Sequence, residues 1–210
     1  MFALHGSPGS IVFANQYGIG GYEMTAREND PPQPQWGDGV NGVICKRAQL
    51  IDGDRPETEG TSNVNLSVVI PSDWVIDSRP VMIAGLHGVT CNIQPWEVFV
   101  AGNVFWFSLN LEQPDGSVKE MRVTYPLILD KVFDFDITFC ASKVKHGYLA
   151  VSVNGVPIWG YANYYGPTIS VKETDRPYRQ FGPYVFLQPG ATWPMPYRRI
   201  FMAFRPSFPV

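Results

Sequence analysis

The stretch that decides the fold class is FDFDITFCASKVKHGYLAVSVNGVPIWGY, residues 133–161. Its first nine residues alternate apolar and polar side chains with a period of two, which predicts a half-buried strand. Residues 148–153 and 156–161 predict two more strands, joined by Asn154-Gly155, a dipeptide that suits a type I′ hairpin turn because both of its positions take positive φ. Pro157 has no amide proton, so we expect the last of these strands to be an edge strand or to carry a bulge. The stretch therefore predicts consecutive antiparallel strands.

The same pattern continues on both sides of this stretch, and no segment shows the periodicity of an amphipathic helix. The tight-turn sequence PDGS, residues 114–117, lies between two of the strand-like segments and predicts a second hairpin. We therefore predict an all-β fold, an antiparallel two-sheet β-sandwich. The further predicted strands are residues 40–51, 63–70, 81–86, 96–100, 103–111, 118–125 and 198–204.

A single sandwich domain is expected to span residues 1–210. A domain of this size buries about 70% of its unfolded surface, which is enough for a full core. The 20 glycines and 19 prolines are scattered between short apolar runs, as a chain of many strands and turns requires. Residues 1–39 are rich in Gly, Pro, Asn and Gln. For them we predict a strand or two and then an irregular loop, because the prolines at 31, 32 and 34 remove hydrogen-bond donors.

The net charge of -3 argues against a surface built to bind nucleic acid or an anionic membrane. The C-terminal part of the chain has the opposite charge, because from residue 172 onward there are six cations and two acids. These cations can hold an acidic partner, or they can simply discourage aggregation at strand edges. The first residues show neither a basic region nor a long apolar run, so we expect no secretion signal and no transmembrane segment, and the compartment stays open.

The three cysteines, Cys45, Cys91 and Cys140, are isolated and odd in number, which predicts buried thiols rather than a disulfide framework. The sequence has no CxxC pair. His87 and Cys91 lie close together but lack further ligands at a suitable spacing. We therefore predict no metal site and no other cofactor.

The segment YRQFGPYVFLQPG, residues 178–190, is the strongest candidate for a functional strand. In an extended chain successive side chains point to opposite faces, so Tyr178, Gln180, Gly182 and Tyr184 share one face. Two phenols and one amide are therefore expected along one line of a sheet surface.

This spacing resembles the YFKxGxY strand of the jelly-roll polysaccharide lyases related to heparin lyase I, glucuronan lyase and the alginate lyases, with Gln180 in place of the lysine. The segment KRAQL, residues 46–50, is similar to their RxEL strand, with Arg47 kept and Gln49 in place of the glutamate. The segment AGLHG, residues 84–88, is similar to their QxH motif, with His87 kept and Gly85 in place of the glutamine. The resemblance implies a concanavalin-like jelly roll.

The resemblance also implies a chemistry, the cleavage of a uronate polymer by β-elimination. This reaction needs a group that neutralises the sugar carboxylate, a base that removes the proton beside it, and an acid that protonates the departing glycosidic oxygen. By resemblance, His87 and Tyr184 are the catalytic residues. Arg47, Gln49, Tyr178 and Gln180 are the substrate-binding residues. Each donor that the motifs lack can cost about 2.7–4 kcal/mol of transition-state stabilisation.

Two function classes stay open. One is a polysaccharide lyase that acts on an acidic glycan, and the other is a non-catalytic jelly-roll module that binds carbohydrate or serves assembly, for example in a phage or viral particle. Assembly implies protein partners or a homo-oligomer formed through the Gly/Pro-rich ends, residues 1–39 and 190–210. A glycan ligand implies an extracellular or virion-associated protein. The lyase hypothesis predicts that Arg47, His87, Gln180 and Tyr184, from three strands, face one groove.

Overall fold

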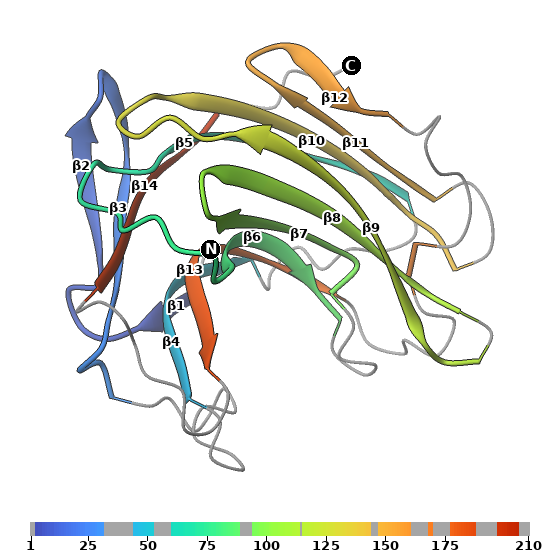
Figure 1. The fold of residues 1–210 in the computed structure, drawn as a ribbon, viewed down its shortest axis with the longest axis horizontal. Coiled ribbons are helices and arrows are strands. Elements are labelled where there is room, and N and C mark those ends of the chain that lie inside the picture. The colour runs from blue at the N-terminus through green and yellow to red at the C-terminus, as the bar shows by residue number, and fades with distance from the viewer. Residues whose placement is uncertain are drawn as a thin grey trace.

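The computed structural model describes residues 3–31, 44–52, 60–88, 94–113, 115–143, 147–160, 168–169, 177–187 and 197–205 (Figure 1). These residues form β-strands and no helix, so the predicted all-β class is confirmed. None of them belongs to a helix that could cross a membrane. The strands are β1 (Ala3–Gly6), β2 (Ile11–Gln16), β3 (Ile19–Arg27), β4 (Ile44–Asp52), β5 (Gly60–Val69), β6 (Val81–His87), β7 (Trp96–Ala101), β8 (Val104–Glu112), β9 (Val118–Pro126), β10 (Phe133–Ala141), β11 (Tyr148–Val153), β12 (Val156–Trp159), β13 (Tyr178–Leu187) and β14 (Tyr197–Phe204).

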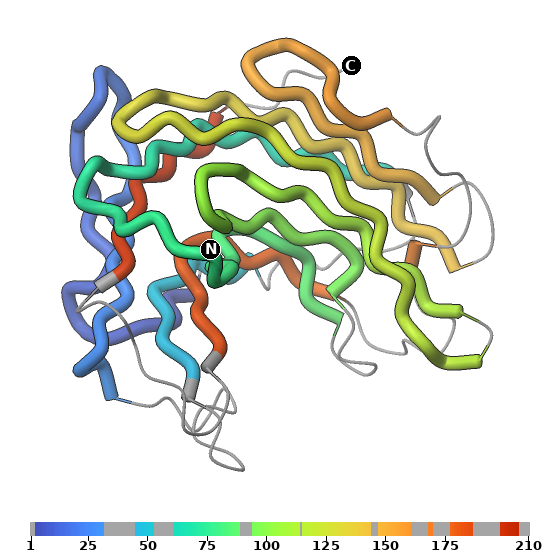
Figure 2. The backbone as a smooth tube through the Cα atoms, in the orientation of Figure 1, coloured from blue at the N-terminus to red at the C-terminus, as the bar shows by residue number. Residues whose placement is uncertain are grey.

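The strands form two antiparallel sheets of seven strands each, which confirms the predicted sandwich. The site sheet has the order β1-β4-β13-β6-β7-β8-β9, and the cover sheet has the order β12-β11-β10-β5-β14-β3-β2. Both sheets arch in the same direction, with β6 to β8 of the site sheet on the inside of the arch (Figures 1 and 2). Strand β13 lies between β4 and β6, so it joins segments that are far apart in the sequence.

The core lies between the two sheets, and the alternation of β10 explains it. Phe133 and Phe135 of this strand point inward and are at most 1% exposed, while the intervening aspartates face outward. The Phe135 ring meets Phe105 and Phe107 of β8 edge to face, at centroid distances of 4.9 and 5.2 Å. Such pairs add about 0.5–1.5 kcal/mol beyond the burial of their area. The apolar positions of the period-two pattern in β10 therefore supply the side chains that pack the two sheets together.

The predicted Asn154-Gly155 turn is confirmed, with φ of 52° and 75° at its two residues. Val153 pairs directly with Val156 across it. The Asn154 side chain also accepts a hydrogen bond of 2.8 Å from the Asp134 amide, which fixes the turn to β10. Strand β12, which contains Pro157, is an edge strand with an irregular register, as the proline predicted.

Replacing Gly155 with valine is expected to lower the free energy of unfolding by about 1–3 kcal/mol, because a β-branched residue is strained at positive φ. Urea unfolding measures this change. Gly160→Val is the matched control, since a Cβ atom on Gly160 would have no neighbour within 4 Å and its φ is not positive. Equal losses in the two variants would contradict the assignment of the strain to the turn.

The N-terminal region differs from the prediction of a strand or two. Residues 3–27 form three strands, with β1 at the edge of the site sheet and β2–β3 as a hairpin in the cover sheet. Tyr17 and Gly18, with φ of 55° and 80°, make the tight turn between β2 and β3. Position 21 in β3 needs a glycine, because a Cβ atom there would be 2.5 Å from the Met202 carbonyl oxygen. The glycines that suggested an irregular segment therefore allow β3 to approach β14 closely.

Other expectations fall partly outside the described residues. Cys45 is buried and Cys140 is half-buried, while Cys91 lies outside the described residues. Of the Gly/Pro-rich C-terminal end, residues 190–196 and 206–210 lie outside them too. Its remaining part is β14, an inner strand between β5 and β3.

Candidate functional site

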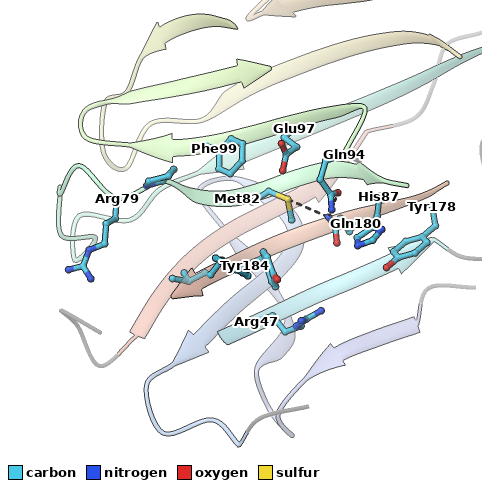
Figure 3. Close-up of a pocket in the computed structure, with 13 residues that line it drawn as sticks. Arg47, Arg79, Met82, His87, Gln94, Glu97, Phe99, Tyr178, Gln180 and Tyr184 are labelled. Carbon is cyan, nitrogen blue, oxygen red and sulfur yellow. Dashed lines mark hydrogen bonds between the residues drawn. The ribbon is translucent and has the colours of Figure 1, made fainter. Parts of the chain in front are cut away.

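A pocket of about 620 Å³ opens on the free face of the site sheet (Figure 3). We call it the groove. Its described lining comes from four neighbouring strands and the segments next to them. The lining residues are Arg47, Arg79, Pro80, Met82, His87, Gln94, Glu97, Phe99, Tyr178, Gln180, Tyr184, Val185 and Phe186.

The strand register arranges these residues in rows across the sheet, one strand spacing of about 4.8 Å apart. In the tyrosine row, Arg47 of β4 lies opposite Tyr184 of β13, which lies opposite Met82 of β6. In the central row, Gln180 lies opposite Gly85, which lies opposite Glu97 of β7. In the histidine row, Tyr178 lies opposite His87. The structure therefore brings five of the six sequence-predicted site residues into one groove.

Strand β13 is irregular at Gly182 and Pro183, just before Tyr184. Gly182 has φ of 120°, and its Cβ position points into the sandwich, against the Ala48 carbonyl and 2.7 Å from the Met24 sulfur. Simple alternation would have placed position 182 on the groove face together with Gln180 and Tyr184. The register of β13 shifts against β6 between Phe181 and Tyr184, after which Tyr184 again faces the groove.

Tyr184 is held from two sides by β4. The Arg47 guanidinium lies over its ring at 4.7 Å from the centroid, a cation–π contact. The Tyr184 Oη atom is 3.1 Å from the Cys45 Sγ atom, within hydrogen-bond distance. The phenol is therefore positioned at the tyrosine-row end of the groove, next to a positive charge.

His87 and Tyr178 form a ring pair at the other end of the groove. Their centroids are 5.0 Å apart and their planes differ by 5°, so the rings are stacked. Burial raises the pKa of the Tyr178 phenol above its usual value, and the nearby Arg47 charge opposes this shift. Tyr178 is therefore a neutral hydrogen-bond donor at physiological pH.

Gln180 is fixed in the floor of the groove, where its side chain is 4% exposed. Its Nε2 atom donates to Gln94 Oε1 at 3.2 Å and lies 3.4 Å from the Met82 sulfur (Figure 3). The two amides thus form a linked pair between the tyrosine and histidine rows.

Gln49 is the one predicted site residue that does not line the groove. It is fully buried and lies directly opposite His5 of β1, the edge strand on the other side of β4. Burial first, and the Arg47 charge second, lower the pKa of His5 to about 4, so His5 is neutral at physiological pH. Gln49 and His5 therefore form a neutral buried layer beside the groove.

Glu97 is a lining residue that the sequence interpretation missed. Its pKa is raised to about 7, chiefly by burial, with the Glu120 charge adding to the shift and a hydrogen bond from Asn110 opposing it. The alternation of residues 96–100 indicates only that Glu97 lies on the face opposite Trp96 and Val98. No local signal in the sequence shows that this face meets Gln180 and Tyr184.

Arg79, Gln94 and Phe99 also line the groove without having been predicted. Among the residues that the structure describes, no three His, Cys, Asp or Glu side chains gather closely enough to hold a metal ion.

Comparison with known proteins places the fold. No protein-family model and no curated protein sequence matches the chain. Among solved structures, the endo-β-1,4-glucuronan lyase from the fungus Trichoderma reesei superposes with a TM-score of 0.67 at 10% identity, covering 96% of this chain and 88% of that chain. The family 7 alginate lyase A1-II′ superposes with a TM-score of 0.63 at 13% identity, covering 94% of this chain and 84% of that chain.

The predicted resemblance is therefore confirmed at the level of the fold, which is the jelly roll of these polysaccharide lyases. The fold also occurs in a botulinum neurotoxin type C, whose cell entry depends on interaction with two ganglioside molecules. That structure superposes with a TM-score of 0.55 at 10% identity and covers 97% of this chain but 42% of its own.

Proposed function

We propose that the groove binds an acidic glycan, with uronate residues as the charged units. The observation that carries this proposal is the composition of the lining. The described lining residues combine two arginines, Arg47 and Arg79, with a single carboxyl group, that of Glu97, in a chain whose net charge is -3. A local excess of positive charge in a concave site attracts anionic ligands.

The uncharged part of the lining supports a sugar rather than a small inorganic anion. Tyr178, Tyr184 and Phe99 offer aromatic rings, and Gln94 and Gln180 offer amides. Aromatic rings suit the apolar faces of sugars, while amides and phenols pair with hydroxyl groups. Two proteins with this fold are named as lyases of glucuronan and alginate, and this supports uronates as the first ligands to test.

Replacing Arg47 with alanine is expected to weaken the binding of a glucuronan oligosaccharide by about 10- to 100-fold, because a hydrogen bond to a charged group contributes about 1.5–3 kcal/mol. Isothermal titration calorimetry measures the change. Lys119→Ala removes one positive charge from an exposed position of β9 outside the groove lining and should leave the affinity nearly unchanged. Equal losses in both variants would indicate a general charge effect instead of a site at Arg47.

The second candidate function is β-elimination at this groove, and the shared lining by His87, Tyr184 and Arg47 favours it. In this reaction the C–H bond beside the uronate carboxylate and the glycosidic C–O bond break, and a C=C bond forms. The register sets a geometric demand, because His87 and Met82, the residue opposite Tyr184, are five positions apart on β6, roughly 16 Å along a strand. Their side chains must therefore converge from the two ends of the groove on one sugar ring.

The test of catalysis is the ultraviolet absorbance of the unsaturated ends that elimination produces from glucuronan, alginate or heparin-like polymers. If the groove is catalytic, Tyr184→Phe and His87→Ala should each lower the rate by about 10²–10⁴, the usual contribution of a general acid or base. Binding without absorbance change in the unmodified protein would identify a non-catalytic carbohydrate-binding module. An absence of binding to every acidic glycan, with the fold intact, would leave the assembly function as the remaining hypothesis.

A further inference from the structure

Glu97 lies in the central row of the groove, on β7, because of its register with β6. Trp96 and Val98 on either side of it are each 1% exposed in the core, so Glu97 faces the groove. Directly opposite it on β6 is Gly85, which in turn lies opposite Gln180. The central row therefore has an amide, a residue without a side chain, and a carboxyl group on three adjacent strands.

The Glu97 side chain extends over the Gly85 backbone. A Cβ atom on Gly85 would lie 3.5 Å from Glu97 Cγ and 3.4 Å from the Met82 sulfur. Gly85 stands where the QxH motif has its glutamine. The polar group next to this position is the Glu97 carboxyl group, which comes from the neighbouring strand β7. Figure 3 shows Glu97 beside Gln94, which is paired with Gln180.

A hydrogen bond fixes the Glu97 carboxyl group. Asn110 of β8 donates from Nδ2 to Glu97 Oε2 at 2.9 Å and also to the backbone carbonyl oxygen of Gln94 at 2.7 Å. Since Oε2 accepts this hydrogen bond, the acid proton belongs on Oε1. With the pKa raised to about 7 by burial, the carboxyl group is mostly neutral at mildly acidic pH and mostly ionised above pH 8.

We propose that protonated Glu97 donates a hydrogen bond to the carboxylate of a uronate residue bound over Gly85, and that ionised Glu97 repels the same carboxylate. This inference rests on the proposed acidic-glycan function and assigns a positioning and pH-sensing role within it. A neutral carboxylic acid can donate to an anionic oxygen, whereas two carboxylates at hydrogen-bond distance are mutually unfavourable. Acidic-glycan binding is thereby switched off as the pH rises through neutrality.

Other charged groups around Glu97 act on the same ligand. From β9, Glu120 contributes to the field at Glu97, and it is paired with Arg122 at 2.8 Å. Arg47, Arg79 and Tyr178 line the groove from β4, from the segment before β6 and from β13. Burial raises the pKa of Tyr178, so its phenol stays neutral between pH 5.5 and 8.5.

His87 of β6 is the group that must be separated from Glu97. Histidine is the side chain that most often changes charge near neutral pH, and the loss of a positive charge also weakens the binding of an anion. A pH profile of the unmodified protein alone therefore combines two effects of the same sign. Variants at the two positions separate them.

The test measures the dissociation constant of a glucuronan oligosaccharide by calorimetry at pH 5.5 and 8.5. The variants are Glu97→Gln, which keeps an acceptor for Asn110 and a permanent donor, and His87→Asn, which removes the imidazole. We expect the affinity of the unmodified protein and of His87→Asn to fall by about tenfold or more between the two pH values. Between the same two pH values, the loss of affinity in the Glu97→Gln protein should be smaller than that in the unmodified protein by a factor of about ten or more.

A direct readout accompanies the binding data. Carbon-13 NMR of side-chain carboxyl groups should show one resonance that titrates near pH 7 in the unmodified protein and is missing from Glu97→Gln. A neutral cello-oligosaccharide serves as the ligand control, and its binding should show no pH step that depends on Glu97.

The outcomes separate this inference from the proposed function. Acidic-glycan binding with the same pH profile in the unmodified protein and in Glu97→Gln overturns the role of Glu97 and leaves the proposed function standing. A Glu97 resonance that titrates below about pH 5 also overturns it, because that is the range of an ordinary exposed glutamate. No binding of glucuronan or alginate oligosaccharides at pH 5.5, with the fold intact, overturns both.

Discussion

Replacing Gly182 with alanine is expected to lower the free energy of unfolding by about 2–6 kcal/mol. Two costs add. A residue with a side chain is strained at φ of 120°, which costs about 1–3 kcal/mol. The new methyl group also overlaps the Ala48 carbonyl and the Met24 sulfur, and such overpacking costs about 1–3 kcal/mol. Chemical denaturation with urea measures the loss.

Gly116→Ala is the matched control for this variant. Gly116 has φ of 82°, so an alanine there would be strained, but a Cβ atom at this position would have no neighbour within 4 Å. It should therefore show the strain cost alone and remain clearly more stable than Gly182→Ala. A loss of equal size in both variants would show that the close approach of β13 to β4 and β3 contributes nothing. Any Gly182→Ala protein that folds should also bind acidic glycans more weakly, because the new methyl group would displace the backbone two residues before Tyr184.

Replacing Asp77 with alanine is expected to lower the free energy of unfolding by about 2–4 kcal/mol. Its carboxylate accepts a hydrogen bond of 2.7 Å from Nη2 of Arg198, whose side chain is 3% exposed and whose guanidinium lies 5.2 Å from the Trp74 ring centroid. Burial lowers the pKa of Arg198, and the Asp77 charge opposes that shift. Removing one partner of a buried ion pair costs about 3–5 kcal/mol, and the partial exposure of Asp77 reduces the cost.

The neighbouring pair of Asp73 and Arg199 provides the control. Its two side chains are 33% and 34% exposed, and its shortest distance is also 2.7 Å. Because water can solvate Arg199, Asp73→Ala should cost no more than about 1 kcal/mol. Thermal unfolding of the two variants compares a buried and a half-exposed ion pair on adjacent residues of β14. Similar melting temperatures would refute the importance of burial for Arg198. A clear difference would show that the burial of Arg198 makes its ion pair with Asp77 the more stabilising of the two.

Local rules explain why much of the fold could be predicted from the sequence. Alternation over residues 133–141 reports which side chains are buried, because the side-chain period of a strand does not depend on its neighbours. The Asn154-Gly155 turn is likewise decided by the φ preferences of two residues. The N-terminal strands were underpredicted because glycines such as Gly21 look like loop residues until the strand packed against them is known.

The candidate site was predictable only where it lies on one strand. Tyr178, Gln180 and Tyr184 share the groove face of β13 as alternation predicted, although the backbone at Gly182 departs from simple alternation. Arg47 and His87 were predicted from the resemblance to lyase motifs. The three short motifs of that resemblance fall on β4, β6 and β13, which are adjacent strands of the site sheet. The same resemblance proposed Gln49, which the pairing of β1 with β4 places in a buried layer instead.

By itself, the sequence determined most of the strands and their turns, and the inward or outward direction of most side chains, since these depend on neighbours within a few residues. Only the tertiary structure decided that β7 lies beside β6 with Glu97 opposite Gly85, and that the Glu97 carboxyl group is buried enough to hold its proton near neutral pH. Sheet order and the desolvation of a side chain are set by contacts between segments far apart in the chain. The free energy of those contacts is not contained in any local pattern of residues.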